Sequence, residues 1–270
     1  MISVIIPTLN EEKNINKLIP YLQNCCKGYD AEIIISDYGS MDNFLEVAKA
    51  LNAKVVRASC KGRAMQMNSG AAEATHSIFY FVHADSIPPP SFCADILAAL
   101  NSGYEFGRYR TRFESNNLLL KLNAFFTRFD WYMCYGGDQT LFITKSLFIK
   151  LTGYKESLLI MEEYDLVERA KQIARYKIFS KATIVSARKY QPNSWLKVQK
   201  ANFKTVQLYK KGLSQPEMVA KYKQALKDIR MRSTQIKAMT ELITGIQQVG
   251  IGVQDADAAK IAYKNDFGIM

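Results

Sequence analysis

The first hundred residues alternate short, continuously apolar runs with segments whose apolar residues recur every three or four positions. Such runs predict strands, and the recurring pattern predicts helices. The expected strands span residues 2–7, 32–36, 54–58 and 77–82, and the expected helices span 11–25, 43–51 and 62–74. Because these strands are apolar throughout, both faces of their sheet should be covered. The alternation favours right-handed crossovers and a mostly parallel sheet.

The chain is less regular from about residue 99. We expect strands at 105–113, 139–144 and 182–186, and helices at 118–131, 145–151, 162–174, 194–211 and 216–237. In 194–211, one face should carry Trp195, Val198, Phe203, Val206 and Tyr209, and the other Lys197, Lys200, Lys204 and Lys211. The pattern as a whole predicts an α/β fold with a mostly parallel central sheet flanked by helices and a helical, basic C-terminal segment.

The positive charge is concentrated in one part of the chain. Residues 187–240 carry 13 Lys and Arg against two acidic residues, Glu217 and Asp228, and so account for the whole net charge of +11. The helices at 194–237 could make peripheral contact with an anionic membrane. We favour the alternative, in which the apolar face of these helices packs on the sheet and the lysines remain in water. Nucleic acid is not an expected partner, because no base-stacking or groove-reading motif accompanies the charge.

The cysteine pattern and the hydropathy indicate where in the cell the protein is expected. Five cysteines at scattered positions indicate reduced thiols, neither a disulfide framework nor a zinc site. We see no export signal and no apolar run long enough to span a bilayer. The expected location is therefore cytoplasmic. If the basic helices do contact a membrane, the protein would attach peripherally to its inner face.

Polar and glycine-bearing turns follow each of the first four expected strands, at residues 7–12, 37–40, 60–63 and 83–85. Ligands bind outside the carboxyl ends of strands in open α/β sheets, so a site is expected there. Asp37 could contact a sugar or base edge, and Lys61 and Arg63 could face a diphosphate. A single carboxylate such as Asp85 suits Mg²⁺ or Mn²⁺ when substrate phosphates complete the coordination shell.

Three carboxylates open the expected helix at 162–174, namely Glu162, Glu163 and Asp165. Acidic residues at a helix N-terminus are stabilised by the helix dipole, which is one explanation. Acidic side chains crowded together could equally supply a general base.

These stretches resemble a family 2 glycosyltransferase of the GT-A fold. The resemblance rests on residues 3–12, 37–40, 83–86, 135–139, 161–163 and 186–190, in family order and spacing. Residues 62–70, Gly-Arg-Ala-Met-Gln-Met-Asn-Ser-Gly, are typical of a subfamily labelled arsenosugar-biosynthesis-like. The match covers about 1–225, with a nucleotide-binding half at 1–98 and an acceptor half at 99–225. Residues 226–270 would be a helical linker and a strand–helix tail, which weakly resembles the start of a glyoxalase-like (vicinal oxygen chelate) domain.

The resemblance implies inverting transfer of a sugar from a nucleotide-diphosphate-sugar donor to an unknown acceptor, with Mn²⁺ or Mg²⁺ as cofactor. Asp85 would hold the metal, with His83 as a further candidate, and Glu163 would be the base. The donor side would comprise Pro7, Thr8, Asn10, Glu11, Asp37, Gly39, Ser40, Lys61, Arg63, Gln66, His83, Ala84 and Asp85. The acceptor side would comprise Gly137, Asp138, Gln139 and Arg188.

Two departures from the family pattern leave alternatives open. His83 stands where the family has the first acid of its metal motif, and Glu163 replaces the usual Asp base with a side chain one methylene longer. Glu162 or Asp165 could therefore be the base. A nucleotide- or sugar-binding module without catalytic activity is the second interpretation. The motif of processive polymer synthases is absent from the sequence.

Overall fold

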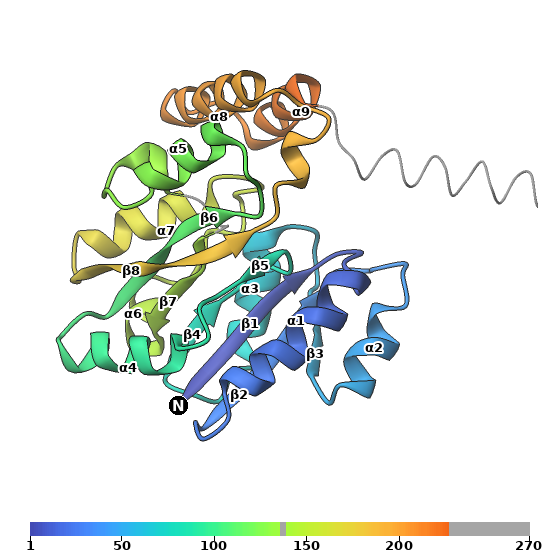
Figure 1. Ribbon diagram of the computed structural model, residues 1–270, viewed down its shortest axis with the longest axis vertical. Helices are drawn as coiled ribbons and strands as arrows, with labels where there is room; N and C mark the ends of the chain where they lie inside the picture. The colour runs from blue at the N-terminus through green and yellow to red at the C-terminus, as the bar shows by residue number, and fades with distance from the viewer. Residues whose placement is uncertain (136–138, 227–270) are drawn as a thin grey trace, which may run out of the picture. The chain divides into compact units, whose positions relative to one another are not determined.

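The computed structural model describes residues 1–135 and 139–226, all within one compact unit, Met1–Lys227 (Figure 1). Gly137 and Asp138 lie outside the described residues. So do the expected tail and the end of the helix expected at 216–237.

One eight-stranded sheet organises the described part of the chain, in the order β3-β2-β1-β4-β7-β6-β8-β5. β1 pairs in parallel with both β2 and β4, and β2 in parallel with β3. β7 runs antiparallel to both of its neighbours, whereas β6 and β8 are parallel to each other. The strands are β1 (Ile2–Thr8), β2 (Ala31–Asp37), β3 (Lys54–Arg57), β4 (Ile78–Phe81), β5 (Ser86–Ile87), β6 (Phe106–Phe113), β7 (Leu141–Thr144) and β8 (Tyr176–Val185).

Helices cover both faces of this sheet. One core contains apolar side chains of α1 (Glu12–Cys25), α2 (Phe44–Ala50) and α4 (Phe92–Asn101). The core on the other face contains those of α3 (Arg63–Ala72), α6 (Lys145–Lys150) and α7 (Glu162–Lys171). Successive β1 residues alternate between them, with Val4 and Ile6 in the first core and Ile5 in the second. The expected α/β fold with covered strands is confirmed.

The rest of the described chain gathers at one end of the sheet, as Figure 1 shows. It comprises α5 (Leu118–Phe126), two short 3-10 helices, η1 (Tyr132–Cys134) and η3 (Arg188–Tyr190), and the helices α8 (Trp195–Lys210) and α9 (Gln215–Ala225). A small third core joins Met161, Val206 and Met218, so the segment that leads into α7 packs against α8 and α9.

Two sequence predictions were wrong in this region. The helix expected at 118–131 ends at Phe126, because the buried Arg108 guanidinium donates hydrogen bonds to the carbonyl oxygens of Thr127 (2.8 Å) and Phe129 (3.1 Å). The strand expected at 182–186 is longer and begins at Tyr176, where it pairs with Phe106.

The third error concerns one side chain of the basic helix. Phe203 was expected on the apolar face of α8, but it is 52% exposed. The buried face of α8 consists of Val198, Ala201, Thr205 and Val206. Phe203 therefore shares the solvent-facing side with the lysines.

Gly107 allows β6 to lie close to its neighbours. A Cβ at this position would lie 2.4 Å from the Lys177 backbone oxygen and 2.6 Å from the Phe142 ring. We expect Gly107→Ala to lower the free energy of unfolding by about 1–3 kcal/mol, because the neighbouring backbone cannot move aside cheaply. Urea unfolding followed by circular dichroism would measure this. A change below about 0.5 kcal/mol, the range of neutral surface substitutions, would contradict it.

No helix in residues 1–135 and 139–226 is long and apolar enough to cross a membrane.

Candidate active site

The candidate site lies at the carboxyl ends of β1, β2 and β4. Because these strands are parallel neighbours, Asp37 at the end of β2 reaches the same edge of the sheet as Asn10 and His83, which follow β1 and β4. Pro7 and Thr8 end β1 inside the buried sheet, and Ala84 is buried in the turn after β4. Lys61 is exposed in the turn before α3. The structure thus brings the predicted donor-side turns to one edge.

The first two turns are joined by hydrogen bonds. The Asp37 carboxylate accepts from the Ser40 hydroxyl (2.5 Å) and from the Ser40 backbone N–H (3.2 Å). The Ser40 hydroxyl accepts from the Asn10 N–H (2.8 Å), while the Asn10 side chain accepts from the Met41 N–H (2.8 Å). Gly39 adopts a φ of +67°, which favours glycine in this tight turn. The Asp37 carboxylate therefore shapes the loop that a donor would meet.

α3 carries the Gly-Arg-Ala-Met-Gln-Met-Asn-Ser-Gly stretch, and its polar residues hold the segments that form the site. Gln66 is buried and donates to the carbonyl oxygens of Thr8 (2.5 Å) and Ser36 (3.0 Å), which ties the ends of β1 and β2 together. Asn68 donates to the Tyr154 carbonyl (2.8 Å) and accepts from the Tyr154 N–H (3.0 Å). Gln66 thus supports the strand ends, while its contact with the donor stays a prediction.

Gly70, the last residue of that stretch, lets α3 lie against β1. A Cβ there would lie 2.5 Å from the Ile5 side chain. Gly70 therefore contributes through close packing, whereas Gln66 and Asn68 contribute through hydrogen bonds to the backbone.

Asp85 is held by an arginine from the other half of the chain. Arg188, at the start of η3, donates to the Asp85 carboxylate at 2.9 Å and to both oxygens of Glu11 at 2.8 and 3.1 Å. The hydrogen bond to Glu11 is the first cause that raises the pKa of Arg188, and the Asp85 charge adds to it. Arg188, predicted on the acceptor side, thus lies among the donor-side residues.

The turn that carries Asp85 is anchored to the strand that leads to Arg188. β5 pairs with the end of β8, and the Ser186 N–H donates to the Asp85 carbonyl (3.3 Å). This pairing brings the two residues together although 103 positions separate them in the sequence.

The residues at this turn fit a divalent metal held by few protein atoms. The Asp85 side chain is 26% exposed, and an oxygen ligand of this kind suits Mg²⁺ or Mn²⁺. Within the described residues no group of three or more His, Cys, Asp or Glu could enclose a metal ion. Phosphate and water oxygens would therefore have to complete the shell, as they commonly do for Mg²⁺.

His83 pairs with Glu163. Its Nε2 lies 2.8 Å from Glu163 Oε1, and both side chains are buried. The second metal candidate thus contacts the predicted base.

The pKa values of the two adjacent glutamates shift in opposite directions. Burial raises the pKa of Glu162, and the neighbouring Glu163 adds to this while Arg63 opposes it. Burial would also raise the pKa of Glu163, but the charges of His83 and Arg63 and the hydrogen bond from His83 outweigh it, so the pKa is lowered. Glu163 therefore holds its charge at lower pH than Glu162, which is the pattern that separates a base from its neighbour.

Glu162 contacts α3 across the site. Arg63 Nε lies 2.8 Å from Glu162 Oε1, yet within the part of the chain that the structure describes neither carboxylate oxygen of this buried side chain has hydrogen-bond geometry to a partner. The Arg63 charge therefore stabilises the start of α7 through space.

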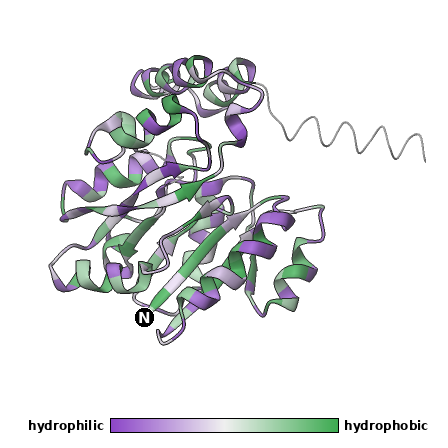
Figure 2. Cartoon of the chain, viewed as in Figure 1, coloured by the Kyte–Doolittle hydropathy of each residue, from purple (hydrophilic) through white to green (hydrophobic). Residues whose placement is uncertain are grey.

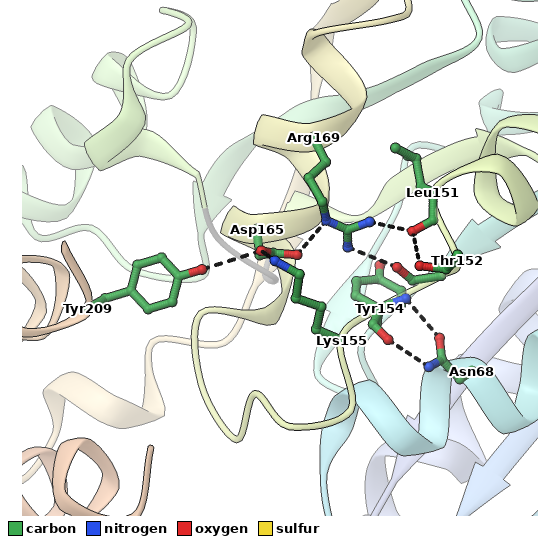
Figure 3. A network of polar contacts seen from close by, with 9 residues as sticks. Asn68, Leu151, Thr152, Tyr154, Lys155, Asp165, Arg169 and Tyr209 are labelled. Carbon is green, nitrogen blue, oxygen red and sulfur yellow. Dashed lines mark hydrogen bonds and ion pairs between the residues drawn. The ribbon is translucent and has the colours of Figure 1, made fainter. Parts of the chain in front are cut away.

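Asp165 belongs to a different network, shown in Figure 3. Its two oxygens pair with Lys155 (2.6 Å) and with Arg169 (2.7 Å). Arg169 also donates to the carbonyls of Leu151 (2.5 Å) and Gly153 (2.9 Å), in the loop that precedes α7. These contacts favour a structural role for Asp165 in fixing that loop.

Three non-glycine residues at the site have left-handed backbone that such residues rarely adopt, and one of them is Asn10, with a φ of 54°. Met161, immediately before Glu162, has a φ of 71°, and Thr140 has a φ of 58° although it is β-branched. Such conformations cost about 1–3 kcal/mol and occur preferentially at functional sites. Next to Thr140, the buried Gln139 donates through its side-chain nitrogen to the Cys134 carbonyl (2.8 Å), and its side-chain oxygen has no hydrogen-bond partner among the described residues.

The His83–Glu163 pair predicts a pH effect. In His83→Gln, the charge that lowers the pKa of Glu163 is gone while its burial remains, so that pKa should rise. A base must be deprotonated to act, so the acidic limb of the pH–rate profile should move to higher pH. Initial rates between about pH 5 and 8 would show it. If the acidic limb of the pH–rate profile stayed at the same pH, the ionisation of Glu163 would not determine it.

Comparisons with known proteins agree with this architecture. A model of the family described as Glycosyl transferase family 2 matches residues 3–155, more than half of the chain. The dolichol-phosphate mannosyltransferase of Pyrococcus furiosus is 32% identical over 107 residues, which is 38% of this chain and 30% of that protein. The chain thus spans less than a third of that relative's length.

Two solved structures share the fold at low identity. The structure of S. aureus TarS residues 1–349 has a TM-score of 0.57 at 16% identity, covering 82% of this chain and 70% of that one. Glucosyl-3-phosphoglycerate synthase from Mycobacterium tuberculosis, in complex with Mn²⁺, UDP and phosphoglyceric acid, has a TM-score of 0.57 at 20% identity, covering 79% of each chain. With the matching family model, the sheet and its flanking helices lead to one conclusion: the chain belongs to glycosyl transferase family 2 and has the GT-A fold.

Proposed function

We propose that this protein transfers a sugar from a nucleotide-diphosphate-sugar donor to a hydroxyl acceptor, with inversion at the anomeric carbon. The observation that carries the proposal is the arrangement of two carboxylates after β4 and at the start of α7. Asp85 is part-exposed beside Arg188, and Glu163 is buried on His83, the residue two positions before Asp85. Asp85 can thus act at the diphosphate of the donor, and Glu163 can act on the hydroxyl of the acceptor.

The donor side combines charge with a shaped loop. The Asp37–Ser40 turn and the Asn10 loop would contact the nucleotide, since they form one hydrogen-bonded surface after β1 and β2. Arg188 would lie near the diphosphate. Asp85 would be the protein ligand of Mg²⁺ or Mn²⁺, which when bound supplies Lewis-acid stabilisation of the leaving diphosphate.

Glu163 would act as general base. Its lowered pKa keeps it ionised, and it would accept the proton of the acceptor hydroxyl as that oxygen attacks the anomeric carbon. His83 would hold the carboxylate in position. Arg63 and Glu162 would fix the N-terminus of α7 against α3.

The donor and acceptor remain to be identified by experiment. The Mycobacterium synthase was solved with UDP and either Mn²⁺ or Mg²⁺, so UDP-sugars are the first donors to test. We also propose membership of the arsenosugar-biosynthesis-like subfamily, on the stretch at residues 62–70. Gln139 and Arg188 are described residues of the proposed acceptor side, and Arg188 would serve both sides. Peripheral membrane contact through the basic helices is developed below.

Calorimetry with UDP, GDP and their glucose and mannose esters, each with and without Mn²⁺, tests the proposal. We expect one nucleotide to bind at micromolar affinity, more tightly with Mn²⁺, and its sugar ester to be hydrolysed slowly. Absence of binding by every nucleotide would overturn it. Binding without hydrolysis or transfer to any acceptor would favour the non-catalytic binding module.

A further inference from the structure

α5 is an apolar helix, and residues 1–135 and 139–226 leave most of its leucines exposed. Its sequence is Leu-Leu-Leu-Lys-Leu-Asn-Ala-Phe-Phe, and Leu120 is its one buried residue. The exposed fractions are 78% for Leu118, 43% for Leu119, 47% for Leu122 and 44% for Phe125. Figure 2 shows the hydrophobic colouring of this helix. Contiguous exposed apolar side chains of this kind mark a surface that contacts something other than water.

An aromatic cluster extends the apolar surface beyond α5. The Phe129 and Trp131 rings are stacked with centroids 4.7 Å apart, and the Phe126 and Trp131 centroids are 5.8 Å apart. Trp131 is 53% exposed and Met133 is 45% exposed. Aromatic side chains with one apolar and one polar end are enriched where a protein meets the boundary between lipid and water.

Positive charges border these apolar side chains. Arg128 lies 3.7 Å above the Phe125 ring, and Lys121 is exposed within α5 itself. Lys210, at the end of α8, lies 4.4 Å from the centroid of the Tyr132 ring. α8 therefore ends beside the aromatic segment that follows α5, and Figure 1 draws the two helices at the same end of the protein.

The solvent-facing side of α8 also combines exposed apolar side chains with positive charges. Leu196 is 61% exposed and Phe203, seven positions later, is 52% exposed, so the two lie on one face of the helix. Exposed lysines surround them, namely Lys197, Lys200, Lys204, Lys210 and Lys211. Residues 169–216 contain no Asp or Glu, so no acidic side chain within this segment offsets these lysines.

We propose that the exposed residues of α5, of residues 128–133 and of α8, here called the α5–α8 surface, bind an anionic lipid bilayer. The leucines and aromatic rings would enter the boundary between headgroups and acyl chains, and the lysines and arginine would contact lipid phosphates. The charges argue against a second copy of the chain as the occupant. A two-fold interface places the same patch against itself, which would bring the lysines of both copies together.

This surface adjoins the start of the helix that carries the proposed base. The Tyr132 ring of η1 lies 5.3 Å from the ring of Tyr164, the residue after Glu163. A bilayer on the α5–α8 surface would therefore hold an amphiphilic acceptor near the site. That last step rests on the proposed function, whereas binding to the bilayer does not.

Vesicle co-sedimentation of the full chain, without donor or metal, tests the proposal. We expect binding to vesicles of phosphatidylcholine with phosphatidylglycerol, and little binding to phosphatidylcholine alone. Binding should fall in about 1 M NaCl, where the Debye length is about 3 Å. Trp131 emission should shift to shorter wavelength on binding, and Trp131→Phe should remove that shift while Trp195 remains.

Matched variants separate the two contributions. Lys197→Gln/Lys200→Gln/Lys204→Gln should weaken binding on the order of 100-fold, since each lysine near an anionic surface contributes about 1 kcal/mol. Lys13→Gln/Lys17→Gln/Lys27→Gln, with three exposed lysines of another region, should leave it unchanged. Leu118→Ser/Leu122→Ser should weaken binding roughly tenfold. Ile149→Ser/Leu45→Ser, at similarly exposed positions, should not.

The outcomes are decisive because all of these side chains are exposed, so the variants should fold, as circular dichroism would check. Absence of vesicle binding by the full chain would overturn the proposal. So would equal weakening by the control variants. A dimer in analytical ultracentrifugation that Leu118→Ser/Leu122→Ser dissociates, without vesicle binding, would assign the surface to self-association instead. Failure to bind any nucleotide would leave the vesicle result intact.

Discussion

Glu163→Gln should reduce the turnover number for sugar transfer by about 10²–10⁴-fold, the contribution of a general base. The substitution keeps the size of the side chain and removes its ability to accept the proton of the acceptor. Donor affinity should stay within about twofold of the wild type, because Glu163 contacts no donor group in the proposed arrangement. Single-turnover kinetics with a confirmed donor, beside calorimetry of the nucleotide, would separate the two quantities.

The neighbouring acids provide the controls. Glu162→Gln keeps the buried shape next to Arg63 and should affect turnover far less. Asp165→Asn removes a carboxylate paired with Lys155 and Arg169. It should lower the thermal midpoint more than the rate per folded molecule. If Glu162→Gln abolished turnover while Glu163→Gln retained it, the base would be Glu162.

The sequence predicted the first half of the fold well for a physical reason. β1 and β2 are mainly apolar and largely buried between two helical layers, and their ends differ from the expected ones by at most one residue. In contrast, β8 contains Lys177, Ser180 and Lys181. Because these polar residues interrupt the apolar pattern, the first six residues of the strand were not predicted. The end of α5 was missed because Arg108, far away in the sequence, binds the carbonyls that would have continued the helix.

The candidate site shows the same division. Because the strands were expected to be parallel, the sequence predicted that polar turns gather after β1, β2 and β4. The contacts between the turns did not follow from it. Arg188 reaches Glu11 across 177 positions and Asp85 across 103, and no local pattern signals such pairs. Gln66 and Asn68 matched a family stretch, yet only the structure shows that they hold backbone segments.

Asp85→Asn should abolish the Mn²⁺ dependence of donor binding and weaken donor affinity at saturating Mn²⁺ by roughly 10²-fold or more. The asparagine keeps the shape of the turn after β4 but removes the charge that would hold a divalent cation. Calorimetry of the nucleotide over a range of Mn²⁺ concentrations measures both effects. The amide oxygen of asparagine can still accept the hydrogen bond from Arg188, so the position of η3 should be retained.

The substitution Arg188→Ala tests whether Asp85 acts as a metal ligand or only as a hydrogen-bond partner of Arg188. If Asp85 acts by binding metal, then removing Arg188 frees the carboxylate oxygen to which it donates, and Mn²⁺ should bind the nucleotide-free protein more tightly. Donor affinity should nevertheless fall, because a positive charge near the diphosphate is lost. The two constants would thus move in opposite directions. If Asp85→Asn and Arg188→Ala instead weakened donor binding equally at every Mn²⁺ concentration, Asp85 would serve only to position Arg188, and the guanidinium rather than a metal would neutralise the diphosphate.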